Sequence, residues 1–170
     1  LVILGDAILT AIARKPGLAN GRTADGIYQD FVRQVTELPK FNAKSKCMIA
    51  LAFITPRVDS PMESKTRIAT TKYGLPPAVT NYTVPGATFS NGAPITLDLA
   101  WPEFRVAIEY DGDHHRTDKN QWRRDNDKRE LLRHHHWIVI IATAANMADE
   151  PSQAELAYRV GRQLALRGAV

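Results

Sequence analysis

Two strand-like runs joined by a very short link constrain the fold of this chain more than any other feature. Residues 95–100 (ITLDLA) and 105–110 (RVAIEY) each match a β-strand, and Pro102 and Glu103 between them form a tight turn. Two strands joined so closely are typical of a β-hairpin. A continuous apolar run, 137–142 (WIVIIA), predicts a further strand that is buried on both faces of a sheet. We therefore expect a fold built around a β-sheet.

Helices are predicted on either side of these strands. Ser60 is a good N-cap, Pro61 suits the first helical position, and Glu63 completes a capping box, so a helix begins here and ends at Gly74. The remaining expected elements are a strand at 79–84, turns at Pro85-Gly86 and Asn91-Gly92, and helices at 118–134 and 153–166. The order helix, strand, hairpin, helix, strand, helix predicts an α/β fold with a mixed sheet flanked by helices.

The first third of the chain has a different pattern. Apolar residues recur at helical spacing over 2–13 and 25–38, and a more hydrophobic third helix is expected over 43–54. No residue in this part suggests catalysis. We therefore divide the 170 residues into a helical N-terminal subdomain, 1–58, and an α/β domain, 59–170.

Composition excludes several classes of protein. Charged residues make up 24% and hydrophobic residues 44%, which are ordinary globular values. Cys47 stands alone, which excludes a disulfide framework and a cysteine-based zinc finger. The longest nearly apolar run is far too short for a membrane span. We expect a cytoplasmic protein that does not enter a membrane. Its net charge of +4 mildly favours polyanionic partners.

Three carboxylates fall in or just after the hairpin. Asp98 lies within the first strand, where burial is unfavourable unless a cation or donor meets it. Glu109 and Asp111 are two residues apart at the end of the second strand and therefore share a face. Pairing of the strands brings Asp98 opposite both. Clustered carboxylate oxygens favour a hard divalent cation, Mg²⁺ or Mn²⁺. The alternative is structural: acidic residues at strand ends also begin solvated loops.

Histidines follow the carboxylates and occur again before the last strand. His114 and His115 come after the turn at Gly112, within reach as a general acid or base, or as an extra ligand. The run 134–136 consists of three histidines, whose side chains point in different directions on a helix and cannot share one ion. We interpret that run as a helix C-terminus, where the dipole favours positive charge.

These motifs together resemble a known nuclease family. The stretches LDLAWPEFRVAIEYDGDHH, WRRDNDKRELL and WIVII are similar to the very-short-patch-repair-endonuclease-like branch of the PD-(D/E)XK nuclease superfamily. The resemblance covers roughly half of the chain. It implies a restriction-endonuclease-like fold and Mg²⁺-dependent or Mn²⁺-dependent cleavage of phosphodiester bonds, with DNA as the expected substrate and RNA as the alternative.

The resemblance also assigns roles to individual residues. By position, Asp98 corresponds to the first acidic ligand and Glu109 to the acidic residue of the second motif. His115 resembles the histidine after the Asp-Gly turn, and Glu63 matches the acidic residue on the first helix. Asp111 stands where many relatives carry a lysine, and is expected to act as third ligand or base. The capping box remains a rival explanation for Glu63.

The helix after the motif carries many charges. Lys119, Arg123 and Arg124 are candidate phosphate contacts, whereas Asp125 and Arg129 are interpreted as part of a solvated face. The function expected from the sequence is an endodeoxyribonuclease. The missing motif lysine keeps an alternative open: a catalytically inactive module of the same fold. Such a module would bind nucleic acid, a protein partner or a second copy, in a toxin–antitoxin or defence context.

Overall fold

The computed structural model describes residues 1–112 and 119–169, and for residues 119–122 it describes the backbone alone. The chain divides into two compact units, Leu1–Ser64 and Lys65–Val170, which we call the N-terminal and C-terminal units. The division falls inside a helix, a few residues after the boundary that the sequence suggested.

The N-terminal unit is helical, as expected. Its helices before residue 60 are α1 (Val2–Arg14), α2 (Pro16–Ala19), α3 (Ala24–Glu37) and α4 (Lys44–Leu51). Leu9, Ile27, Leu51 and Ile54 form its buried core. Two details differ from the sequence expectation. The third predicted helix is shorter than 43–54, and α2 is an additional short helix that begins at Pro16, because proline suits a first helical position.

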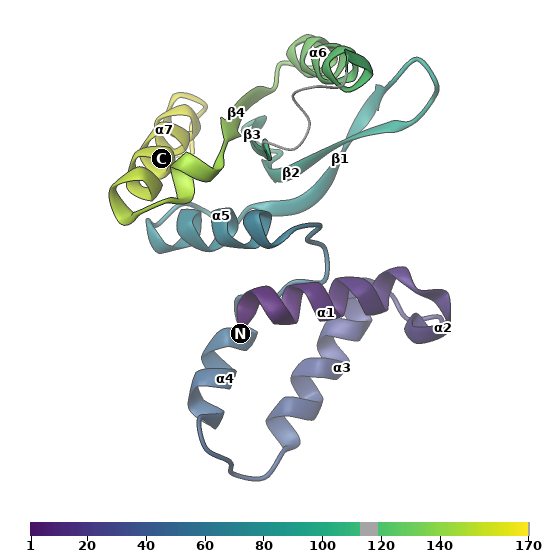
Figure 1. Cartoon of the computed structure of the whole chain (residues 1–170), viewed down its shortest axis with the longest axis vertical. Coiled ribbons are helices and arrows are strands. Elements are labelled where there is room, and N and C mark those ends of the chain that lie inside the picture. The colour runs from purple at the N-terminus through teal and green to yellow at the C-terminus, as the bar shows by residue number, and fades with distance from the viewer. Residues whose placement is uncertain (113–118, 170) are drawn as a thin grey trace. The chain divides into compact units, whose positions relative to one another are not determined.

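The C-terminal unit has the predicted order of elements. They are α5 (Pro61–Lys72, which begins in the N-terminal unit), β1 (Val79–Thr88), β2 (Pro94–Trp101), β3 (Val106–Tyr110), α6 (Lys119–His134), β4 (Ile138–Ala142), the 3₁₀ turn η2 (Ala144–Met147) and α7 (Glu150–Leu166). The sheet order is β1-β2-β3-β4. β1, β2 and β3 pair antiparallel, and β4 joins β3 in parallel. The mixed α/β class is confirmed. Figure 1 shows α6 on one side of the sheet and α5 and α7 on the other.

Local signals set the ends of α5. The Glu63 N–H donates to the Ser60 hydroxyl over 3.2 Å, which confirms the predicted N-cap. At the other end Gly74 has a φ of +79°, in the left-handed region that favours glycine. The Gly74 N–H reaches the Thr71 carbonyl and the Leu75 N–H reaches the Thr70 carbonyl, which is a Schellman ending.

Two strand predictions are wrong in detail. Pro85 and Gly86 lie inside β1 and not in a turn between strands. The pairing of β1 with β2 shifts register between Thr83 and Thr88, and Gly86 has a φ of +73°, so the pair forms an irregularity that the strand continues through. β4 is last in the sheet order, and three of its five residues are only half-buried, so it is not buried on both faces.

None of the helices in the described part of the chain is both long enough and apolar enough to cross a membrane.

Candidate nuclease site

Asp98 and Glu109 are neighbours across β2 and β3. Leu99 pairs with Ile108, so the next step of the antiparallel register sets Asp98 beside Glu109. The Asp98 N–H donates to Glu109 Oε1 over 3.3 Å, and the Tyr110 N–H donates to Asp98 Oδ2 over 2.8 Å. Backbone donors of the hairpin therefore hold both carboxylates in place. This is the pairing that the short hairpin link implied.

The two carboxylates lie on the face of the sheet that α6 covers. Asp98 is two residues from Ala100, and Glu109 is two residues from Ala107, so strand periodicity turns all four side chains to one face. Ala100 and Ala107 belong to the same buried cluster as Leu132 of α6. The packing of Leu132 on the sheet thus sets α6 over the carboxylate pair.

Lys128 of α6 completes this group. It precedes Leu132 by four residues, which places both side chains on one face of the helix. Its ammonium forms a salt bridge with Glu109 Oε2, and the two side chains are only 21% and 18% exposed. Lys128 is not among the residues of this helix that the sequence analysis singles out. Its position four residues before the apolar Leu132 could have indicated that Lys128 faces the sheet. That inference requires the knowledge that α6 packs on the sheet through Leu132.

The local electrostatics act mainly on Glu109. The pKa of Glu109 is raised from 4.5 to about 7, mainly because the carboxyl group is removed from solvent and also because the Asp98 carboxylate lies beside it. Lys128 opposes both effects through its charge and its hydrogen bond. A cation close to both carboxylates would stabilise their ionised forms.

A cavity of about 240 Å³ opens beside the pair. Asp111, which follows β3, also lines it, as do Asp125 and Arg129 of α6. The Asp111 N–H donates to the Ala142 carbonyl over 2.8 Å, which continues the pairing of β3 with β4. Asp125 and Arg129, interpreted from the sequence as solvated, thus belong to the wall of this cavity.

The donor set of the cavity fits part of a magnesium site. Mg²⁺ is usually held by one or two carboxylates, with waters and substrate phosphates as its other ligands. Asp98 and Glu109 supply two such carboxylates on one face. Within residues 1–112 and 119–169, however, no three His, Cys, Asp or Glu side chains gather closely enough to form a metal-holding group. Asp111 lines the same cavity, and its part as a third ligand or base stays a prediction.

Glu63 has a structural task. The Asp59 N–H donates to Glu63 Oε2 over 2.9 Å, and the Glu63 side chain is buried at the start of α5. The Glu63 carboxylate therefore closes back on the residue before the N-cap, whereas a capping box would take the N–H of the N-cap Ser60 itself. Glu63 belongs to the N-terminal unit and is not among the residues that line the cavity. Its part in a metal site stays a prediction.

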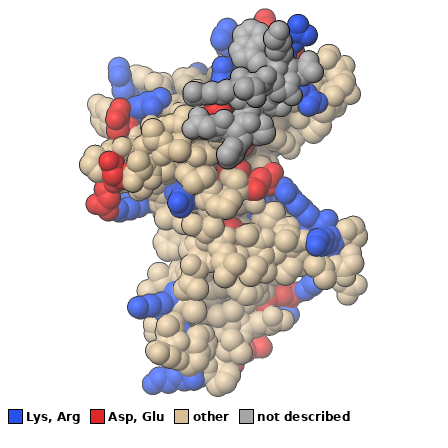
Figure 2. All heavy atoms as spheres, in the orientation of Figure 1, with Lys and Arg blue, Asp and Glu red and all other residues tan. Residues whose placement is uncertain are grey.

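The predicted phosphate contacts lie on α6 as far as the structure describes them. Arg123 and Arg124 are exposed on this helix. Lys119 begins α6, but its side chain is outside the described part, and so is the whole of His115. Figure 2 shows Lys and Arg side chains, in blue, around the end of the C-terminal unit where Figure 1 places α6. The predicted roles of these residues remain predictions.

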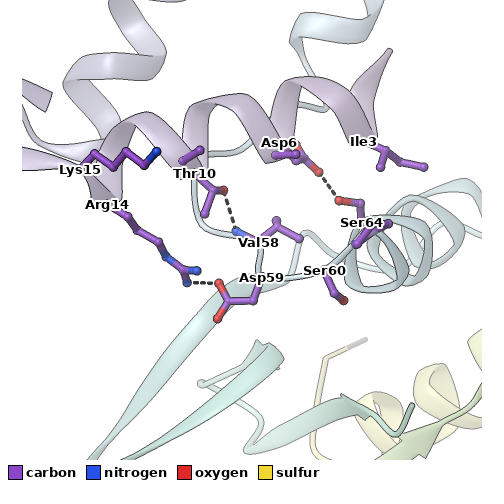
Figure 3. Close-up of a pocket in the computed structure, with 12 residues that line it drawn as sticks. Ile3, Asp6, Thr10, Arg14, Lys15, Val58, Asp59, Ser60 and Ser64 are labelled. Atoms are coloured by element: carbon purple, nitrogen blue, oxygen red, sulfur yellow. Dashed lines mark hydrogen bonds and ion pairs between the residues drawn. The ribbon is translucent and has the colours of Figure 1, made fainter. Parts of the chain in front are cut away.

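A second pocket, of about 330 Å³, lies within the N-terminal unit between α1 and the start of α5. Figure 3 shows Asp6, Thr10 and Arg14 of α1 pointing toward partners in the segment that leads into α5. Asp6 accepts a hydrogen bond from the Ser64 hydroxyl over 2.6 Å and is 1% exposed. Arg14 forms an ion pair with Asp59. These contacts hold α1 to the segment leading into α5, so we assign the pocket a structural role.

The chain is similar to two uncharacterized proteins from strains of Mycobacterium tuberculosis, each 29% identical over 114 residues. The match covers 67% of this chain and 40% of each relative, so the chain spans about two fifths of the length of the relatives that it matches. No protein-family profile matches the chain, and no solved structure matches it.

Proposed function

We propose that the C-terminal unit is a metal-dependent endonuclease that hydrolyses phosphodiester bonds, with DNA as its substrate. The observation that carries the proposal is the partly buried Asp98–Glu109 pair on the wall of a cavity, with Lys128 in a salt bridge to Glu109. Two neighbouring carboxylates disfavour each other's ionised form, so a purely structural role does not explain why two of them lie side by side. A site that binds a divalent cation does explain this arrangement.

In this proposal Asp98 and Glu109 hold Mg²⁺ or Mn²⁺ through carboxylate oxygens. When bound, such an ion stabilises negative charge on the scissile phosphate and lowers the pKa of water. The N–H groups of Asp98 and Tyr110 keep the two carboxylates oriented. Asp111, on the same cavity wall, acts as a third ligand or as a base toward the attacking water. His115 keeps its predicted role as a general acid or base.

The choice of DNA rests on the resemblance to repair endonucleases. Support from the molecule itself is that Arg123 and Arg124 are exposed on α6, about one helical turn before Lys128. Arginine side chains along one helix suit contacts with successive phosphates. RNA offers the same backbone phosphates and serves as the comparison substrate.

Cleavage of plasmid DNA tests the proposal. We expect nicking by the purified protein in Mg²⁺ or Mn²⁺ and none in chelator. Asp98→Asn should reduce the rate by at least about 10²-fold, since metal stabilisation of a phosphoryl transition state is worth several kcal/mol. Asp127→Asn makes the same chemical change on an exposed residue of α6 and should leave the rate unchanged.

The outcomes separate the candidate functions. Equal nicking by the wild type and Asp98→Asn would trace the activity to a contaminant and remove the enzyme proposal. Metal-independent DNA binding without cleavage would assign the fold to the alternative, an inactive nucleic-acid-binding module. The missing lysine at position 111 is the feature that favours this alternative.

A further inference from the structure

Lys128 is held on Glu109 by the packing of its own helix. Leu132, one turn later, is 1% exposed and lies in the core cluster under α6. The lysine ammonium is therefore anchored near the sheet and does not merely extend along the surface. Its side chain is 21% exposed, so solvent screens the salt bridge less than it would at a fully exposed site.

The salt bridge occupies one oxygen that a metal ion would need. Glu109 Oε1 already accepts the Asp98 N–H, and Oε2 takes the Lys128 ammonium. Mg²⁺ binds carboxylate oxygens at a distance of about 2.0–2.1 Å. Such an ion and an ammonium on the same oxygen would repel each other strongly, because both are positive and the Lys128 and Glu109 side chains are largely shielded from solvent.

We propose that Lys128 is a built-in counter-ion that competes with the divalent cation for Glu109 and that cation entry releases its ammonium into the cavity. This inference rests on the proposed function. On this inference Lys128 sets the cation concentration at which the site becomes occupied. Once released, the ammonium remains tethered above the carboxylate pair, where it would meet a phosphate of the nucleic acid. Lys128 would then supply positive charge that position 111 lacks.

The competition predicts opposite effects of one substitution on two measurements. Lys128→Gln removes the competing charge, so Mn²⁺ should bind at least about tenfold more tightly, given the strength of a unit charge at this range. The same variant should cleave DNA more slowly at saturating Mn²⁺, because the tethered ammonium is gone. A lysine that only supports the fold would not tighten metal binding.

Calorimetric titration of the full chain with Mn²⁺ measures the first effect. It is carried out at about pH 8.5, so that Glu109 is ionised and protons do not compete with the metal. Lys128→Arg keeps the charge and should bind Mn²⁺ within about twofold of the wild type. Arg133→Gln removes a positive charge from an exposed position of the same helix and should change nothing. Lys128→Met replaces the Gln variant if that variant does not fold.

The Asp98→Asn variant separates a failure of this inference from a failure of the proposed function. Loss of Mn²⁺ binding in Asp98→Asn, with unchanged or weaker binding in Lys128→Gln, would overturn the competition and leave the metal site standing. Absence of Mn²⁺ binding in the wild type and in every Lys128 variant would remove the metal site and this inference together. Tighter binding in Lys128→Gln alone, with Lys128→Arg and Arg133→Gln like the wild type, supports the inference.

Discussion

Glu109 is the residue whose protonation should govern the stability of the metal-free protein. Its pKa is raised from 4.5 to about 7, first by burial and then by Asp98. The folded protein therefore retains a proton that the unfolded chain has released between these pH values. Its contribution to stability is fully present below about pH 4.5 and is lost as the pH rises through about 7.

At the residue scale we predict that Glu109→Gln removes this pH dependence. The wild type in chelator should lose up to about 3 kcal/mol of its free energy of unfolding between about pH 5 and pH 8, since one pKa unit corresponds to about 1.4 kcal/mol. The Gln variant cannot ionise and should lose much less. Urea unfolding at both pH values measures the difference.

Glu103→Gln provides the matched control, because Glu103 is exposed in the turn between β2 and β3. It should retain the pH dependence of the wild type. A Glu109→Gln variant with the same pH dependence as the wild type would contradict the raised pKa of Glu109.

Two helices of the C-terminal unit end with the same backbone motif and different residues. Gly74 follows α5 with a φ of +79°, and His136 follows α6 with a φ of +59°. The His136 N–H donates to the Arg133 carbonyl and the Trp137 N–H to the Leu132 carbonyl, each over 2.9 Å. Glycine adopts this left-handed conformation without strain, whereas histidine does not.

At the element scale we therefore expect His136→Gly to stabilise the protein by about 0.5–1 kcal/mol. This is the difference between the strain that is relieved when the side chain is removed and the larger backbone entropy that glycine loses on folding. Gly74→Ala should have the opposite sign and destabilise by about 1 kcal/mol. Thermal unfolding measures both. Destabilisation by His136→Gly would show that contacts of the histidine side chain outweigh its backbone strain.

The whole molecule carries a net charge of +4, which by itself attracts nucleic acid without choosing a face. The positions of the charges decide which face binds nucleic acid, and the net charge does not. Arg123 and Arg124 are exposed on α6, on the side of the sheet that carries the carboxylate pair, whereas Arg159 and Arg162 are exposed on α7, across the sheet. The two pairs of arginines carry equal charge but lie on opposite sides of the sheet.

At the scale of the whole molecule we predict that Arg123→Gln with Arg124→Gln lowers the salt dependence of duplex DNA binding. Each lost phosphate contact should reduce the slope of log affinity against log salt by about 0.9, so the pair should reduce it by about 2. Arg159→Gln with Arg162→Gln should leave the slope unchanged. Equal losses in both double variants, measured by fluorescence anisotropy across a salt series, would mean that net charge alone drives binding.

Much of the fold could be predicted from the sequence because its signals are local. Ser60 caps α5 and Gly74 ends it through contacts within a few residues, and the short link between β2 and β3 leaves an antiparallel hairpin as the simple solution. The hairpin register also brings Asp98 beside Glu109. The Pro85-Gly86 pair misled the prediction, because its turn signal is equally compatible with an irregular strand.

The sequence by itself determined the order of elements, the mixed α/β class and the meeting of two carboxylates on one hairpin. Only the tertiary structure decided that Lys128 lies on Glu109 and that Asp125 and Arg129 line the cavity. These contacts join α6 to β3 across a long separation in the chain, and they depend on how Leu132 seats the helix on the sheet. Helix packing comes from side-chain shape over a whole interface, and no short stretch of sequence carries that information.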